Sequence, residues 1–144
     1  MDNQVTIQFR MDITQDGNTR EISFSSLGHQ RLEVIDDALF MTLTYQEPMM
    51  DSDDIISVKM NIKPNQINIF RQGEVKGMQI YKLNEETESF ILTNYGKIKY
   101  QVHTHQLAYD ETSIHLMYEL LFAGVVEGKF HMTIQIQPQE GVER

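Results

Sequence analysis

Alternation of apolar and polar side chains constrains the fold of this chain more than any other feature. In residues 5–13, "VTIQFRMDI", every odd position is apolar and every even position is polar. Successive side chains of a β-strand point to opposite faces, so this segment has one buried face and one face in water. The pattern predicts a strand of an antiparallel sheet.

The same period recurs along the chain and predicts about nine or ten short strands. The alternating or apolar segments are 22–24, 31–35, 38–46, 56–62, 67–69, 78–80, 90–92, 98–102, 114–122 and 130–136. Turn signals separate them, such as "QDGN" at 15–18 and "KPN" at 63–65. The segment "SIHLMYELLF" contains helix-forming residues, but its even positions are uniformly apolar, so we expect a strand there as well.

A meander of this kind leaves two all-β architectures, a sandwich and a closed barrel. Closure removes the edge strands that invite aggregation, which favours the barrel. The chain has 144 residues, the size of one ordinary domain, and we expect residues 1–144 to form it. The polar tail after about residue 137 is expected to fray.

Composition and charge exclude several classes of function. The chain has no cysteine, which removes disulfides, thiolate nucleophiles and cysteine-bound zinc. The net charge of −9 argues against binding to nucleic acid and to anionic membrane surfaces. The N-terminus lacks the pattern of a signal peptide, and no apolar run approaches the length that crosses a bilayer. We therefore expect a cytoplasmic protein.

Three stretches together resemble a known family. They are "NIFRQGEVKGMQIY" at 68–81, "YGKIKYQVHTHQLAY" at 95–109 and "IHLMYELLFAGVVEGKFHMTIQIQ" at 114–137, and they resemble the YwiB-like uncharacterised β-barrel proteins of Gram-positive bacteria. The resemblance implies an antiparallel up-and-down barrel of about eight to ten strands, similar to lipocalins and streptavidin and thus of calycin type. It implies no activity, because none is assigned to that family.

Arg71 is the first candidate for a ligand-binding residue. It follows Ile67 and Ile69 at strict alternation, so it is expected to project inward near a strand end. A guanidinium at a barrel mouth can bind a carboxylate or a phosphate with two hydrogen bonds. The structural alternative is that Arg71 pairs with an acidic residue at the rim, because a buried charge must be paired.

Four further residues share the inward parity. Tyr100 and Tyr118 could supply hydroxyl groups to a ligand, although an inward tyrosine is more often part of the core. Met60 and Met78 are flexible apolar side chains that suit a packed core and an adaptable pocket equally well. The large side chains expected inside are Phe9, Phe24, Phe90, Phe122, Phe130 and Tyr118, so a filled lumen is a live alternative to a ligand-holding one.

Polar clusters elsewhere are better explained as surface. If Tyr100 and Val102 point inward, His103 and His105 point outward, and His115 and His131 have the same outward parity. A metal site needs three or four converging ligands, so we expect surface histidines and no metal. A slip of parity between Val102 and Leu107 suggests a bulge. The acidic runs "DSDD" at 51–54 and "NEETE" at 84–88 lack the spacing of a calcium loop and are expected to be solvated.

No catalytic motif is present, so we expect no catalytic residues, no cofactor and no enzyme. The first functional hypothesis is a binding module that takes a small amphipathic or apolar ligand in the barrel mouth. The alternative is a filled barrel that meets a protein partner, or a second copy of itself as a homodimer, through its outer surface. Packing of the lumen separates the two hypotheses.

Overall fold

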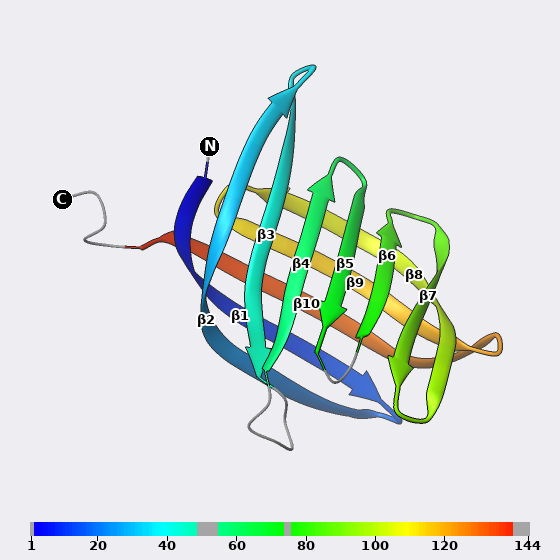
Figure 1. The fold of residues 1–144 in the computed structure, drawn as a ribbon. Helices are drawn as coiled ribbons and strands as arrows, with labels where there is room; N and C mark the ends of the chain where they lie inside the picture. The colour runs from blue at the N-terminus through cyan, green and yellow to red at the C-terminus, as the bar shows by residue number, and fades with distance from the viewer. Residues whose placement is uncertain (1, 49–54, 74–75, 140–144) are drawn as a thin grey trace.

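The computed structural model describes residues 2–48, 55–73 and 76–139, and within them the chain forms ten strands (Figure 1). Their bounds are β1 (Asp2–Gln15), β2 (Asn18–Ile35), β3 (Ala38–Pro48), β4 (Ile55–Lys63), β5 (Gln66–Gln72), β6 (Lys76–Lys82), β7 (Glu86–Thr93), β8 (Gly96–Asp110), β9 (Ser113–Phe122) and β10 (Val125–Pro138). Each strand pairs with the next in sequence, and β1 pairs with β10, which closes the barrel. The expected antiparallel up-and-down barrel is therefore confirmed.

Tight turns of the kind that the strand twist demands connect the hairpins. Asp16 and Gly17, Asp36 and Asp37, and Ala123 and Gly124 all have positive φ. Two consecutive residues with positive φ form the two-residue hairpin loop whose twist matches the flanking strands. The sequence signal "QDGN" is thus confirmed as a hairpin turn between β1 and β2.

The inside of the barrel is filled by side chains. Residues that alternate inward along the strands have almost no contact with solvent, and the fully buried ones include Ile7, Leu43, Met60, Ile67, Ile69, Ile114, Leu116 and Ile134. At the centre, methionine and branched aliphatic side chains meet from opposite walls. The barrel is accordingly a packed core rather than a hollow vessel.

Strand β2 is longer than the sequence suggested. We expected separate strands at 22–24 and 31–35, whereas the structure has one strand throughout. Gly28 lies in its middle and faces inward, where an added Cβ would lie 2.4 Å from the carbonyl oxygen of Thr44 and 2.8 Å from Cδ1 of Ile7. The glycine therefore allows the neighbouring strands β1 and β3 to approach β2 closely and does not mark a turn.

The expected bulge in β8 is confirmed, because the register with β9 shifts between Thr104 and Gln106. At the C-terminus, β10 continues to Pro138, and the N–H of Gln139 donates to the carbonyl of Gln4 at 3.0 Å. The chain thus keeps its pairing just past residue 137. A search for helices capable of crossing a membrane finds none in the described residues.

On strands β6 and β7 the residues that face inward are not the ones that the sequence predicted. Gly77, Gln79 and Tyr81 face inward on β6, so Met78 and Ile80 face outward. On β7 the buried residue is Ser89, so Phe90 and Leu92 face outward too. The physical reason is that directly opposite residues share a face of a sheet, and inward Arg71 lies directly opposite Gly77.

The expected inward position of Phe122 is also wrong. Phe122 ends β9 beyond the packed core, and 48% of its surface is exposed. By contrast, Phe9 lies in the core, and Phe24 and Phe130 pack against it, as expected.

Where the backbone ladder between β6 and β7 ends, side-chain hydroxyl groups form the hydrogen bonds to the backbone. The last backbone pair is Met78 with Phe90. Beyond it, the hydroxyl of Thr87 donates to the carbonyl of Ile80, and the N–H of Ile80 donates to the hydroxyl of Ser89 at 3.2 Å. Side chains therefore satisfy backbone groups at this seam, as a buried wall requires.

Substitution of Gly28 by alanine tests the close approach at the middle of β2. The new Cβ collides with a backbone oxygen that cannot rotate away, so we expect Gly28→Ala to lower the free energy of unfolding by at least about 2 kcal/mol. Urea unfolding followed by circular dichroism measures the change. Ser23→Ala, at an exposed position on the same strand, is the control and should change stability by less than about 0.5 kcal/mol. Equal stability of the two variants would contradict the tight approach.

Candidate functional site

A polar cluster surrounds Arg71 at one end of the barrel. Nε of Arg71 lies 3.3 Å from Oε1 of Glu47, and each side chain is only 19% exposed. Nη1 of Arg71 donates to the amide oxygen of Gln79, whose Nε2 donates to the hydroxyl of Tyr100 at 2.6 Å. A continuous chain of hydrogen bonds thus joins β3, β5, β6 and β8 across the lumen.

The charge of Arg71 is compensated within this cluster. Burial by itself lowers the pKa of Arg71, but the neighbouring Glu47 carboxylate raises it, and the result lies above the usual value. The guanidinium therefore stays ionised, and Glu47 compensates its buried charge. This pairing is the structural role that the sequence offered as the alternative to ligand binding.

Little free space remains beside the cluster. A cavity of about 190 Å³ is lined by Glu47, Arg71, Gly77, Gln79, Phe90 and Ile91. Pockets for drug-sized ligands are usually about 300–1,000 Å³, so this cavity has room for a few heavy atoms only. Among the described residues, Nη2 of Arg71 has no hydrogen-bond partner, which leaves donors next to this cavity.

Four of the five candidate residues separate into three groups. Arg71 and Tyr100 come together through Gln79, as described above. Met60 lies in the packed core with no exposed surface. Met78 lies on the outer face and cannot line the lumen, which corrects the sequence-based expectation.

Tyr118 belongs to a buried aromatic cluster. Its ring stacks on Phe130, with centroids 5.0 Å apart, and lies 4.7 Å from the ring of Tyr81. The hydroxyl groups of Tyr81 and Tyr118 form a hydrogen bond. Burial raises the pKa of Tyr118 to about 12 and raises the pKa values of Tyr81 and Tyr45 further. These hydroxyls therefore remain protonated and act as core groups.

The four histidines lie on the outer wall of β8, β9 and β10, as expected. His105 Nε2 lies 2.7 Å from Oε1 of Glu119, and the ring of His105 stacks on His103 at 4.6 Å. The rings of His115 and His131 are 6.5 Å apart. Within the described residues, no three histidine or acidic side chains converge as a metal site would need. Glu86 and Glu88 are exposed on β7, and "DSDD" at 51–54 lies outside the described residues.

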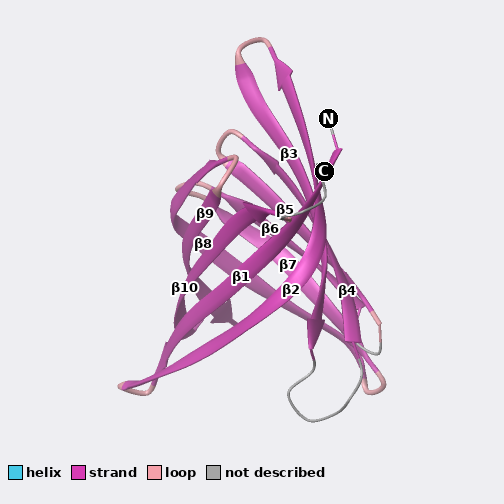
Figure 2. Cartoon of the chain, turned by 90° about the vertical axis from the view of Figure 1, so that its left-hand side faces the viewer, coloured by secondary structure: helices cyan, strands magenta, loops and turns pink. Residues whose placement is uncertain are grey.

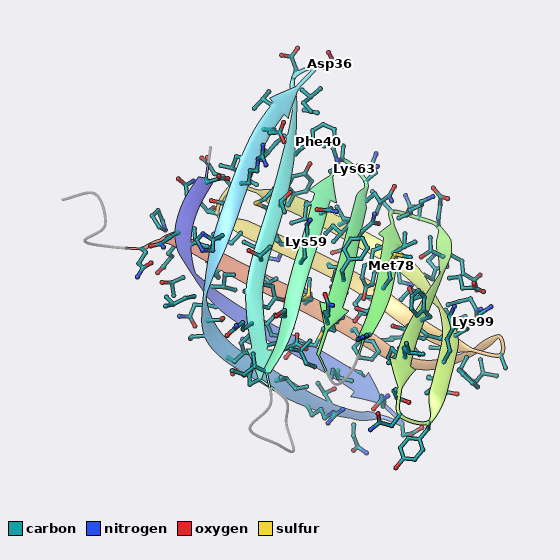
Figure 3. The ribbon with its side chains drawn as sticks, in the orientation of Figure 1. Asp36, Phe40, Lys59, Lys63, Met78 and Lys99 are labelled. Carbon is teal, nitrogen blue, oxygen red and sulfur yellow. The ribbon has the colours of Figure 1, made fainter. Side chains whose placement is uncertain are left out.

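The reversed parity of β6 and β7 creates a second candidate site, a groove on the outside of the barrel. It has a volume of about 770 Å³ and crosses the outer face from β2 to β7. Directly paired residues form one of its sides, namely Thr44, Lys59, Phe70, Met78 and Phe90. Figure 3 shows this face, with Lys59 and Met78 labelled. We call this feature the outer groove.

The opposite side of the outer groove also combines a lysine with apolar side chains. It is formed by the ladder of Gln46, Ser57, Gln72, Lys76 and Leu92, with Leu27 beside it on β2. Leu27 is 64% exposed and Leu92 is 43% exposed, so apolar surface is offered to solvent at both ends. Apolar surface that is contiguous and exposed is typical of an interaction site.

The outer groove is also basic, in an acidic protein. No acidic residue is among the described residues that line it, and no described carboxylate pairs with Lys59 or Lys76. Residues 55–99 hold seven basic and four acidic residues, a net charge of +3, whereas the rest of the chain holds five basic and seventeen acidic residues. The fold therefore gathers the positive charge on the wall that carries the groove.

Sequence reasoning missed Glu47, Gln79 and the outer groove. A signal for Gln79 was available, because a hairpin centred on residue 74 places residue 79 opposite Ile69 and so on its inward face. The signal for the groove follows from the same register, because apolar Met78 and Phe90 are then forced outward. Glu47 carried the same signal as Arg71, because it follows Leu43 and Tyr45 at strict alternation.

Comparisons with known proteins agree with the fold. A family model described as "Domain of unknown function (DUF1934)" matches residues 7–134. The crystal structure of the YwiB protein from Bacillus subtilis is similar, with a TM-score of 0.78 and 20% sequence identity over 96% of this chain and 93% of that one. The expected YwiB-like resemblance is thereby confirmed, and at this identity it concerns the fold alone.

Two further comparisons give no information about function. Ail, the attachment invasion locus protein of Yersinia pestis, matches with a TM-score of only 0.25 and 8% identity over 94% of this chain and 97% of that one. No curated protein matches the chain.

Alkaline titration tests the burial of the tyrosine cluster. The fold favours the protonated form of Tyr118, whose pKa is about 12 in the folded state and about 10 when unfolded. Its contribution is therefore complete below pH 10 and is lost as the pH rises toward 12, by about 3 kcal/mol in total. Urea unfolding between pH 8 and pH 11.5 should show this loss.

Two variants isolate the contribution of Tyr118 to that loss. Tyr118→Phe should show a shallower decline of stability with pH than the unaltered chain. Tyr95→Phe, at a side chain that is 99% exposed, should leave the decline unchanged. A Tyr118→Phe variant with an unaltered slope would mean that this hydroxyl is not buried as described.

Proposed function

We propose that this chain, which belongs to the family described as a domain of unknown function (DUF1934), is a non-enzymatic interaction protein. Its packed barrel is a rigid support, and its outer groove binds a protein segment that carries carboxylates and apolar side chains. The observation that carries the proposal is the coincidence, in one groove, of exposed apolar residues with lysines that no carboxylate of the described residues pairs.

The packing of the barrel favours recognition on the outside over recognition in the lumen. The central side chains are fully buried, and the arginine at the mouth is already paired with Glu47. A ligand in the lumen would have to displace these contacts. A partner on the outer groove covers surface that is already exposed. Its carboxylates can pair with Lys59 and Lys76, which no carboxylate of the described residues pairs.

An acidic protein segment fits the outer groove better than a nucleic acid does. The ammonium group of Lys97 lies over the ring of Phe90, 4.5 Å from its centroid, so this face of the ring is not free to stack on a base. The net charge of −9 also repels a long polyanion, whereas a short segment feels mainly the local positive charge.

A defined peptide tests the proposal. Six neighbouring strands at about 4.8 Å spacing make the groove roughly 24 Å long, which an extended segment of about seven or eight residues spans. A fluorescent eight-residue peptide of alternating Glu and Leu should bind in an anisotropy titration at low salt, and a peptide of alternating Lys and Leu should not. Binding should weaken as salt is added.

Charge reversal in the outer groove provides the matched control. We expect the double variant K59E/K76E to bind the Glu-Leu peptide at least tenfold more weakly and to gain affinity for the Lys-Leu peptide. Lys129→Glu, at an exposed lysine on β10, removes the same kind of charge from the opposite wall and should change neither affinity. Equal binding by K59E/K76E and Lys129→Glu would refute the groove as the site.

A second candidate function is the binding of one small polar molecule at the barrel mouth. The observation that favours it is the cavity of about 190 Å³ beside the free donors of Arg71. The ligand would be small and polar, because the apolar lumen has no room for an amphipathic chain.

Thermal-shift screening tests the second candidate. Small carboxylates and amides should raise the melting temperature, since a ligand present at a hundred times its dissociation constant stabilises by about 2.7 kcal/mol. The shift should disappear in Arg71→Met and persist in K59E/K76E, each compared with its own ligand-free melting temperature. A library without any stabilising compound would rule this candidate out.

A further inference from the structure

The hairpin of β2 and β3 projects beyond the rest of the barrel (Figures 1 and 2). Its two-residue loop consists of Asp36 and Asp37, with φ values of 52° and 66°. Such loops favour Asn-Gly or Asp-Gly, because glycine adopts positive φ without strain. A second aspartate in place of glycine is conformationally costlier, yet it puts two carboxylates at the point of greatest projection.

The hairpin tip combines these charges with exposed apolar side chains. Val34 is 72% exposed and Ile35 is 48% exposed. Glu33 lies directly opposite Phe40, so a third carboxylate and an aromatic ring share its outer face. We call residues 33–40 the hairpin tip. Its chemistry, carboxylates interleaved with apolar groups, is the chemistry proposed above for the segment that enters the outer groove.

The hairpin tip and the outer groove lie on the same face of the molecule. Outward residues of β3 run from Phe40 in the tip through Thr42 and Thr44 to Gln46 in the groove. At about 3.3 Å per residue, roughly 23 Å separate Asp37 in the loop from Thr44 on the near side of the groove. Figure 3 shows Asp36 and Phe40 above Lys59 on this face. A chain cannot bring its own tip back onto its own groove, because one rigid strand joins them.

We infer that the hairpin tip of a second copy occupies the outer groove, and that the reverse contact forms at the same time. This inference rests on the proposed function of the groove. Two copies related by a two-fold axis, with these faces together and strands antiparallel, place each tip over the other groove. Asp36 and Asp37 of one copy then lie over the β3–β4 part of the partner's groove, next to Lys59, and Lys76, two strands further along, adds to the positive charge that attracts them.

The middle of the shared face suits such an axis. Midway between tip and groove lies the ladder of Thr42, Asn61 and Asn68, whose outward side chains are uncharged. Arg31 lies directly opposite Thr42 on β2, and its Nε is 3.9 Å from Oε1 of Glu33, which compensates its charge. Around a two-fold axis each residue meets its own copy, so like charges there would repel.

The size of the contact predicts a weak dimer. A face of about 24 Å by about 25 Å is roughly 600 Å² for each copy, which is at the low end for specific protein interfaces. We expect a dimer that forms at micromolar concentrations and dissociates as salt screens the carboxylate–lysine pairs.

Sedimentation equilibrium of the full chain from 1 to 200 µM, at 50 mM and at 500 mM salt, tests the inference. The unaltered chain should dimerise at low salt, with at least tenfold weaker association at high salt. The tip variant D36K/D37K and the groove variant K59E/K76E should each be monomeric throughout, whereas Lys129→Glu should dimerise like the unaltered chain. Circular dichroism confirms that each variant is folded.

Complementation makes the test specific for this pair of surfaces. An equimolar mixture of D36K/D37K and K59E/K76E should form a heterodimer, because each tip then faces a groove of opposite charge. A chain with all four substitutions should regain the homodimer. Failure of either to associate, or a single-surface variant that still dimerises, overturns the inference.

The outcome also separates this inference from the function on which it rests. A monomeric unaltered chain that nevertheless binds the Glu-Leu peptide through Lys59 and Lys76 would keep the groove as a protein-binding site and exclude the second copy as its occupant. Loss of both peptide binding and dimerisation specificity would reject both.

Discussion

Directly opposite residues of neighbouring strands must point to the same side of a sheet, and a closed barrel transmits this constraint around the whole wall. Once β1 pairs with β10 and Ile7 faces Ile136, one choice of inside face holds for all ten strands. Inward Arg71 then requires inward Gly77, and Gln79 and Tyr81 follow on the same strand. Met78 and Phe90 are left outside, so the outer groove is a consequence of where the buried arginine sits.

The fold was predictable wherever hydrophobicity and parity agree. In β1 the apolar residues and the inward residues are the same, and in the middle of β4, β9 and β10 they largely coincide, so alternation identified both the strand and its buried face. In β6 and β7 they are different, because Gln79, Thr87 and Ser89 are satisfied inside by hydrogen bonds while Phe90 packs outside. A prediction from hydrophobicity alone places the wrong face of such strands inward, because it takes no account of polar side chains that form hydrogen bonds inside the barrel.

The candidate sites divide in the same way. Arg71 was predictable because its position on an alternating strand is local information, whereas its partner Glu47 is 24 residues away and comes close only through strand order. The basic character of the outer groove was hidden for the same reason. Lys59 and Lys76 are well separated in sequence, so no run of positive charge appears until β4 and β6 are placed on one wall.

The seam between β6 and β7 has a consequence for how the barrel moves. Ladders elsewhere are held by backbone pairs along most of each strand, but this seam has three such pairs and then the hydroxyls of Thr87 and Ser89. A hydroxyl can rotate away and return without any change in the backbone register. The wall can therefore part locally while all the other ladders keep their alignment. Because Gln79 lies in the part of this seam that has no backbone pairs and also lines the small cavity, such an opening gives water a route to Arg71 through the side of the barrel.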